Sequence, residues 1–228
     1  MFVDIHTHID NQAVIKILDD NFEEKVLTTW GVHPWEVSCH FDWGEAEWRN
    51  LSQTIDAELS YSGDFSTSFH SARNDVIAIG EVGLDKVHKE TFEKQVEVFE
   101  EMIRLSESYR KPMIVHCVRA YSEIIEIRKK TKAKMPWVIH GFNSSVETMR
   151  QLIGHDMYIS LGEVLYHNEN QAIKILKDIP LDRLFLETDV SERDIKDVYA
   201  KTAELMECDV DFLCKQIFEN YGRLETTH

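Results

Sequence analysis

The sequence predicts a single α/β domain: a TIM-type (β/α) barrel of seven or eight parallel strands spanning residues 1–228. Short apolar runs rich in β-branched residues alternate along the chain with segments whose apolar residues recur every three or four positions. Such alternation is typical of a parallel sheet covered by helices. An open doubly wound sheet is the alternative, but the chain has no Gly-rich dinucleotide or Walker motif to favour it, and no inter-domain linker.

The predicted strands are nearly continuous apolar runs, as expected for strands that are buried on both faces. In chain order they lie in MFVDIHTHI, KVLTTWGVH, DVIAIGEVGLD, KPMIVHCV, MPWVIHGF, MYISLG and RLFLETD. One further run, AVIKIL (Ala13 to Leu18), is either an eighth strand or a helix.

The predicted helices carry their apolar residues on one face. The first two are marked by Trp48, Leu51, Ile55 and Leu59, and by Phe92, Val96, Phe99 and Ile103. Later ones lie in NQAIKILKDI, DIKDVYAKTAELM and DVDFLCKQIF. After VIHGF, Ser144 and Glu147 have the spacing of a capping box, which predicts that a helix begins there.

Composition narrows the class of protein. The formal net charge of -16 disfavours long-range attraction to a polyanion unless bound cations reverse the field locally. No apolar run is long enough to span a bilayer, and the chain starts without a leader pattern, so we expect a cytoplasmic protein with no membrane partner. Four scattered cysteines without a C-x-x-C pair agree with a reducing compartment. The basic run from Arg128 to Lys134 is a solvated surface or a phosphate patch.

The first strand has one apolar face and one face of possible metal ligands. Side chains alternate in a strand, so Asp4, His6 and His8 share a face. Asp4 lies deeper, where it either orients a histidine or makes a structural pair.

Ligand-type residues end five of the predicted strands. They are His6, His8, Glu81, His116, His140 and Asp189. Taken singly, each has a structural explanation as a core histidine or a salt-bridged acid. The carboxyl ends of barrel strands converge on one mouth, however, and one metal centre would satisfy all six buried polar groups together. The sequence therefore favours a metal site at the mouth.

Two further residues stand beside this set. Glu187 shares a face with Asp189 but lies deeper, which favours a role in holding a ligand or contacting substrate. His33, in GVHPW, follows a strand and either touches substrate or shapes that turn.

Six motifs in order, DIHTHID, GVHPW, AIGEVGLD, MIVHC, VIHGFNSS and LFLETD, resemble those of the TatD family of metal-dependent hydrolases, across almost the full chain. The resemblance implies a TIM barrel with two divalent ions and deoxyribonuclease or related phosphodiesterase activity, of the 3'-5' exonuclease type. It also implies that Glu81 bridges the ions. His6, His8 and Asp189 would complete one ion's ligands, and His116 and His140 those of the other.

The loops depart from the family pattern. The family often has Ser-Arg-Asp-Ala after the histidine of MIVHC, whereas here Arg119 is displaced by one position. Asn143 and Ser144 stand where Ser-Gly is common, and the proline usual after ETD is absent. Arg119 and Asn143 are therefore the loop residues we expect to contact substrate.

Four imidazoles and two carboxylates favour zinc, manganese, iron or nickel, with magnesium as an alternative. Two such ions would activate a hydroxide, and Asp189 would accept and return the proton, which makes Asp189 and Glu81 the expected catalytic residues. We expect a phosphodiester substrate, including single-stranded DNA ends, and no obligate protein partner. The alternatives are hydrolysis of amide, lactone or phosphomonoester bonds, or a catalytically inactive metal-binding barrel.

Overall fold

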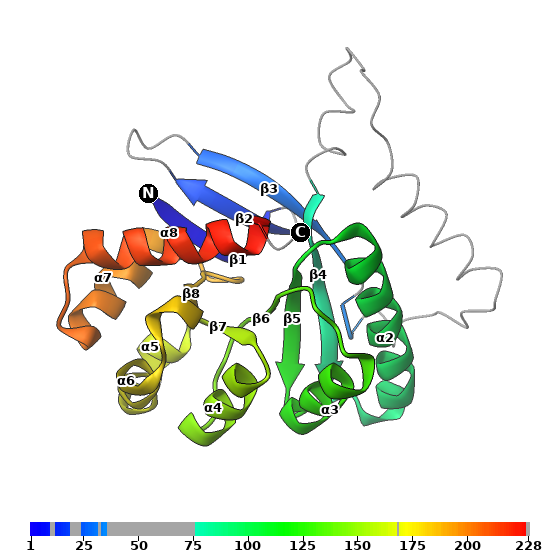
Figure 1. Cartoon of the computed structure of the whole chain (residues 1–228). Helices are drawn as coiled ribbons and strands as arrows, with labels where there is room; N and C mark the ends of the chain where they lie inside the picture. Colours follow the sequence, from blue (N-terminus) through cyan, green and yellow to red (C-terminus); the bar gives the residue numbers. More distant parts are fainter. Residues whose placement is uncertain (10–11, 19–23, 32, 36–75, 168, 227–228) are drawn as a thin grey trace, which may run out of the picture.

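The structure is a computed structural model that describes residues 1–9, 12–18, 24–31, 33–35, 76–167 and 169–226 (Figure 1). The helix predicted around Trp48 to Leu59 lies outside the described residues. From residue 76 onward, the described elements follow the predicted alternation of strands and helices.

One eight-stranded sheet, in the order β1 to β8, runs through the described residues. Its strands are β1 (Phe2–Ile9), β2 (Gln12–Leu18), β3 (Glu24–Trp30), β4 (Val76–Asp85), β5 (Met113–Val118), β6 (Trp137–Ile139), β7 (Met157–Leu161) and β8 (Leu184–Leu186). The run Ala13 to Leu18 is thus a strand. It pairs antiparallel with both β1 and β3, whereas every later pair from β3 to β8 is parallel. Only two residues separate β1 from β2, too few for the crossover that a parallel pair needs.

The sheet closes on itself after β8. Thr7 in β1 and Asp189 form a parallel bridge. The Asp189 amide donates to the His6 carbonyl at 2.9 Å, and the His8 amide donates to the Asp189 carbonyl at 3.3 Å. The first and last parallel strands are therefore neighbours, and the prediction of an α/β barrel is confirmed.

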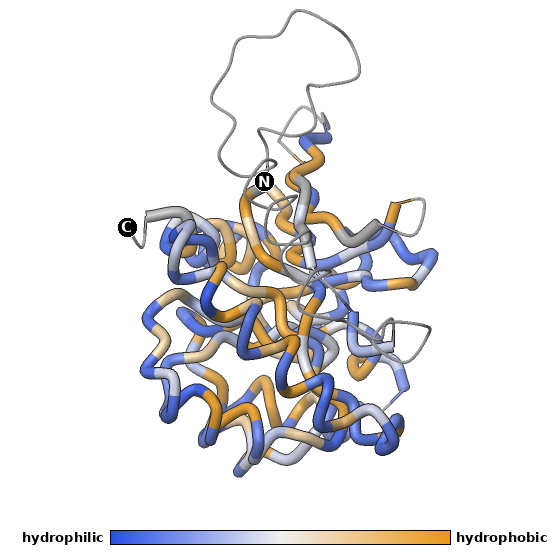
Figure 2. The backbone as a smooth tube through the Cα atoms, turned by 90° about the vertical axis from the view of Figure 1, so that its right-hand side faces the viewer, coloured by the Kyte–Doolittle hydropathy of each residue, from blue (hydrophilic) through white to orange (hydrophobic). Residues whose placement is uncertain are grey.

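Helices pack against the sheet along β1, β4, β5, β7 and β8 (Figure 1). They are α2 (Phe92–Tyr109), α3 (Tyr121–Thr131), α4 (Val146–Gly154), α5 (Val164–His167), α6 (Glu169–Asp178), α7 (Ile195–Met206) and α8 (Val210–Thr226), with 3-10 turns η3 (Lys89–Thr91) and η4 (Leu181–Arg183). Figure 2 shows hydrophobic stretches gathered inside the molecule and alternating hydropathy along the outer helices. None of the described helices has the length and hydrophobicity that crossing a membrane requires.

The start of α4 differs by one residue from its prediction. The N-cap is Ser145, whose hydroxyl accepts a hydrogen bond from the Thr148 amide at 3.1 Å. Ser144 lies one residue before the N-cap. Its hydroxyl donates to the Thr148 hydroxyl at 3.3 Å and does not accept from a backbone amide at the start of the helix. A sequence with two adjacent serines offers two registers of the same capping signal, and only the backbone chooses between them.

Asp4 lies in the core of the barrel, below the histidines of β1, and is 3% exposed. Its carboxylate accepts hydrogen bonds from the Thr188 amide at 3.0 Å and the Thr188 hydroxyl at 2.6 Å. Of the two roles open to Asp4, the structure therefore has the structural pair. This pair ties β1 to the residue before Asp189.

Candidate metal centre

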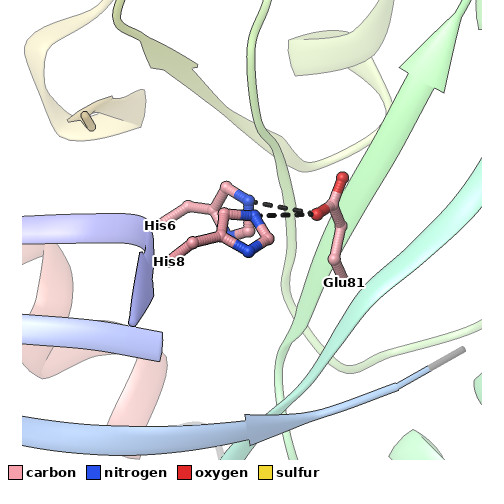
Figure 3. A group of neighbouring side chains, drawn as sticks. All are labelled: His6, His8 and Glu81. Carbon is pink, nitrogen blue, oxygen red and sulfur yellow. Dashed lines mark ion pairs between the residues drawn. The ribbon is translucent and has the colours of Figure 1, made fainter. Parts of the chain in front are cut away.

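The carboxyl ends of β1, β4, β5, β6 and β8 bring the six ligand-type side chains into one cluster. Figure 3 shows His6 and His8 extending from β1 toward Glu81, which extends from β4. His6, Glu81, His116 and His140 are all buried, whereas His8 and Asp189 are partly exposed. The cluster therefore has a buried floor and one accessible edge.

The two carboxylate oxygens of Glu81 face different partners. Its Oε2 lies 3.2 Å from His6 Nε2 and 3.5 Å from His8 Nε2. Its Oε1 lies 2.7 Å from His116 Nδ1 and 2.7 Å from His140 Nε2. Glu81 thus joins the histidines of β1 to His116 in β5 and to His140, which follows β6. We refer to these as the Oε2 side and the Oε1 side of the centre.

Asp189 belongs to the Oε2 side. Its Oδ1 lies 3.5 Å from both His6 Nε2 and His8 Nε2. The Asp189 backbone has a φ of 51°, in the left-handed region, and its amide and carbonyl both bond to β1. The contact that closes the barrel therefore also sets the position of this carboxylate.

Glu187 is 1% exposed and contacts the Oε1 side. Its Oε1 accepts a hydrogen bond from the Gly141 amide at 2.5 Å and lies 3.8 Å from His140 Nδ1. Of the two roles predicted for Glu187, this geometry favours holding a ligand over contacting substrate, because the side chain is closed to the mouth.

His33 also contacts Glu81, with Nε2 3.1 Å from Oε1. Its Nδ1 accepts a hydrogen bond from the Trp35 amide at 3.1 Å, so in a neutral ring Nε2 carries the proton and donates to Glu81. His33 therefore shapes the turn after β3 and at the same time holds the shared carboxylate. The motif GVHPW alone does not predict this contact between His33 and Glu81.

Charge within the cluster is strongly coupled. Burial alone would raise the pKa of the Glu81 carboxyl, but His140, His116 and His33 outweigh burial and hold that pKa well below its usual range. Burial likewise would raise the pKa of the Asp189 carboxyl, but His6 and His8, each with Nε2 3.5 Å from its Oδ1, outweigh burial and hold that pKa below its usual value. Both carboxylates are therefore ionised at neutral pH.

One buried residue of this site, Asp85, is not among the residues predicted from the sequence. Asp85, at the end of β4, is 2% exposed, and its Oδ2 lies 3.8 Å from His116 Nε2. The same oxygen accepts a hydrogen bond from the Trp35 indole at 2.6 Å. The signal was present, because Asp85 is four residues after Glu81 and so has the same strand parity.

Arg119 and Asn143 follow β5 and β6 at the mouth, and both are exposed. Their expected contact with substrate stays a prediction.

The donor set fits a metal ion. On the Oε2 side, His6 Nε2 is a buried imidazole nitrogen with no hydrogen-bond partner among the described residues, and it faces Glu81 and Asp189. Donors held about 2.1 Å from a tetrahedral ion lie roughly 3.4 Å apart. On the Oε2 side the distances from the two histidines to Glu81 and Asp189 are 3.2 to 3.5 Å. Across the two sides, three groups of possible ligands lie close together: His6, His8 and Glu81; His6, His140 and Asp189; and His33, Glu81 and His116.

Comparisons with known proteins point to one family. A family model described as TatD related DNase matches residues 1–226. A protein named as an uncharacterized metal-dependent hydrolase from Buchnera aphidicola is 32% identical over 191 residues, which are 82% of this chain and 67% of that protein. A deoxyribonuclease Tat-D from Schizosaccharomyces pombe is 26% identical over 197 residues, 85% of this chain and 60% of that protein. The chain thus spans about two thirds or less of the length of these relatives.

A solved structure supports the fold assignment. The crystal structure of YjjV, a TatD homologue from Escherichia coli, superposes with a TM-score of 0.71 at 21% identity, and covers 87% of this chain and 76% of the other. At this identity the likeness concerns the fold alone.

Proposed function

The chain belongs to the family of TatD-related DNases, and from this premise we propose that it is a metal-dependent hydrolase that cleaves phosphodiester bonds. The single observation that carries the proposal is the position of Glu81, whose two oxygens face separate sets of histidines at the mouth of the barrel. A carboxylate in that position is suited to bridging two cations.

The Oε2 side would hold one divalent ion through His6, His8, Glu81 and Asp189. The Oε1 side would hold the other through Glu81, His116 and His140. Imidazole-rich sites favour zinc, manganese, iron or nickel over magnesium. Bound ions would supply a water of lowered pKa and would neutralise charge on the phosphoryl group.

Asp189 is the residue best suited to take the proton from the attacking water. It is ionised, and its side chain is 32% exposed, compared with 7% for Glu81. Its carboxylate therefore lies where a proton can be received from the mouth and returned to the leaving group. Glu81 has no comparable access, so its part is to hold ligands and charge.

Two buried acids position the histidines of the Oε1 side. Glu187 lies behind His140, and Asp85 lies behind His116, each 3.8 Å from the ring nitrogen that faces away from Glu81. Carboxylates in this arrangement fix the orientation of a ligating imidazole and raise its basicity.

We propose single-stranded or frayed DNA ends as the preferred substrate, cleaved in the 3'-5' direction. The family description and the name of the fission yeast relative support a nuclease. The net charge of -16, with the basic run Arg128 to Lys134 in the last turn of α3 and the connection that leads to β6, leaves little positive charge to hold an intact duplex at the mouth. Binding should therefore be weak and salt-sensitive.

The test is to load the protein with manganese and incubate it with end-labelled single-stranded and duplex oligonucleotides, alongside amides, lactones and phosphomonoesters. Asp189→Asn should lower oligonucleotide turnover by about 10²–10⁴-fold, because the amide cannot accept a proton. Asp182→Asn, an exposed position in η4, is the matched control and should keep full activity. Hydrolysis of a non-phosphate substrate, without oligonucleotide cleavage that depends on Asp189, would assign the barrel to another reaction. Metal binding without any turnover would make it a binding protein.

A further inference from the structure

Trp35 is a large aromatic residue beside the metal centre that the proposed reaction does not use. It follows β3 and is 53% exposed. Its ring centroid lies 4.9 Å from that of His33 and 6.3 Å from that of His116, both of which contact Glu81. Single exposed aromatics are ordinary on protein surfaces, so exposure alone assigns no role.

Hydrogen bonds to buried residues fix the orientation of the Trp35 indole. Its Nε1 donates to Asp85 Oδ2 at 2.6 Å, and the other oxygen of Asp85 accepts from the Val87 amide at 2.7 Å. Gln95 in α2 holds the Asp85 backbone on both sides, because its Oε1 accepts from the Asp85 amide and its Nε2 donates to the Asp85 carbonyl. A buried acid and a buried amide thus hold a half-exposed ring in one place. Rigid placement lowers the entropy lost when a ligand packs on the ring.

Apolar surface continues beside this ring. Val87 is 56% exposed, and the His88 ring lies 5.8 Å from Trp35. Both residues follow β4, the strand that carries Glu81. One edge of the mouth is therefore aromatic and apolar, beside His33 and His116, which contact the shared carboxylate.

We infer that the exposed surface of Trp35 is a stacking subsite for a nucleobase of the substrate, next to the phosphodiester that is cut; this rests on the proposed function. Every base has a planar face, so stacking on an aromatic side chain binds single strands with little regard to sequence. In a chain of net charge -16, stacking supplies affinity that phosphate contacts cannot. The subsite also favours strand ends and single strands, because bases stacked inside a duplex offer no free face.

The experiment compares two hydrolysis-resistant probes of equal length, a phosphorothioate-linked oligothymidylate and its abasic counterpart. Binding to the manganese-loaded protein is measured by fluorescence anisotropy. Trp35→Ala should weaken oligothymidylate binding about tenfold and leave abasic binding unchanged. Trp35→Phe, which keeps a ring, should stay within about threefold of the original affinity. Phe212→Ala is the matched control, since Phe212 is 50% exposed on α8, at the end of the barrel away from the carboxyl ends of β4 and β5 (Figure 1).

Trp35→Leu gives a second test that does not depend on the alanine variant folding, because leucine fills much of the volume but has no aromatic face. It should lose affinity as alanine does. Equal binding of both probes by the original protein, or equal losses for both probes in Trp35→Leu, would overturn the inference while oligonucleotide cleavage by the enzyme could still stand. Base-dependent binding that Trp35→Leu removes, in a protein without cleavage that depends on Asp189, would support the subsite and overturn the proposed function.

Discussion

The two sides of Glu81 hold their histidines by different means. On the Oε1 side, His116 and His140 each lie between two carboxylates, Glu81 on one ring nitrogen and a buried acid on the other. On the Oε2 side, His6 has no hydrogen-bond partner on Nδ1 among the described residues. There the backbone bonds between β1 and Asp189 set the geometry.

The distances between possible metal ligands also differ between the two sides of Glu81. The Oε2 side has donor distances of 3.2 to 3.5 Å, close to the roughly 3.4 Å of a tetrahedral site. The Oε1 side has its two shortest contacts at 2.7 Å, the length of charge-assisted hydrogen bonds. The barrel closure therefore preorganises one side for an ion, whereas the other must exchange hydrogen bonds for metal bonds. We expect the Oε2 side to bind its ion more tightly.

Replacing the residue common to both sides should have the largest effect. Glu81→Gln keeps the shape but removes the charge that faces both sets of histidines. Metal content should fall at both sides, and turnover should drop by at least the roughly 10²–10⁴-fold expected for loss of the proton acceptor. Elemental analysis and a phosphodiester assay measure the two effects. Retention of one tightly bound ion by Glu81→Gln would mean that the sides are independent.

Removing the acid behind one histidine should affect one side only. Glu187→Gln leaves a hydrogen-bond acceptor for the Gly141 amide but no charge near His140 Nδ1. Loss of such a supporting carboxylate typically lowers metal affinity or activity by about 10–100-fold. Titration with manganese should show the weaker binding step shifted and the tighter step unchanged. Glu219→Gln, exposed on α8, is the control. A shift of the tighter step instead would reverse our assignment of the two sides.

The metal centre also shows what the sequence can predict and what it cannot. The convergence of all six ligand-type residues, on both sides of Glu81, follows from strand parity and from the meeting of parallel strand ends, both of which are visible in a pattern of residues. The role of Glu187 does not follow from the sequence. Its position two residues before Asp189 predicts that it lies deeper in the barrel, but not which histidine it contacts.

Hydrophobic periodicity does not predict the direction in which a strand pairs or the partner that a side chain contacts. The run Ala13 to Leu18 has the composition of a strand, but its antiparallel pairing depends on the short connection from β1. Asp85 has the parity of Glu81, yet its role depends on the Trp35 indole, which arrives from a separate loop. Contacts between segments on different sides of the barrel can be identified only in the folded structure. The residues at the end of each strand, in contrast, can be predicted from the sequence of that strand alone.

The smallest predicted effect concerns protons on the accessible edge of the Oε2 side. Hydrogen bonding to Asp189 and Glu81 raises the pKa of His8 from 6.5 to about 9 in the metal-free protein. Because the charged form is favoured in the folded state, this contribution to stability is full below pH 6.5 and is lost as the pH rises through about 9. A metal ion needs the neutral ring, so its affinity should rise over the same window, by about tenfold per pH unit for each proton released. The midpoint of thermal unfolding in chelator should therefore fall with rising pH, whereas the affinity measured by manganese titration should rise.

His8→Gln should remove the contribution of one proton from the pH dependence of both measurements, whereas His155→Gln, beyond the end of α4, should leave both pH dependences unchanged. Equal pH slopes in the original protein and His8→Gln would show that another group carries the proton, and that the Oε2 side is not the edge where metal and protons compete.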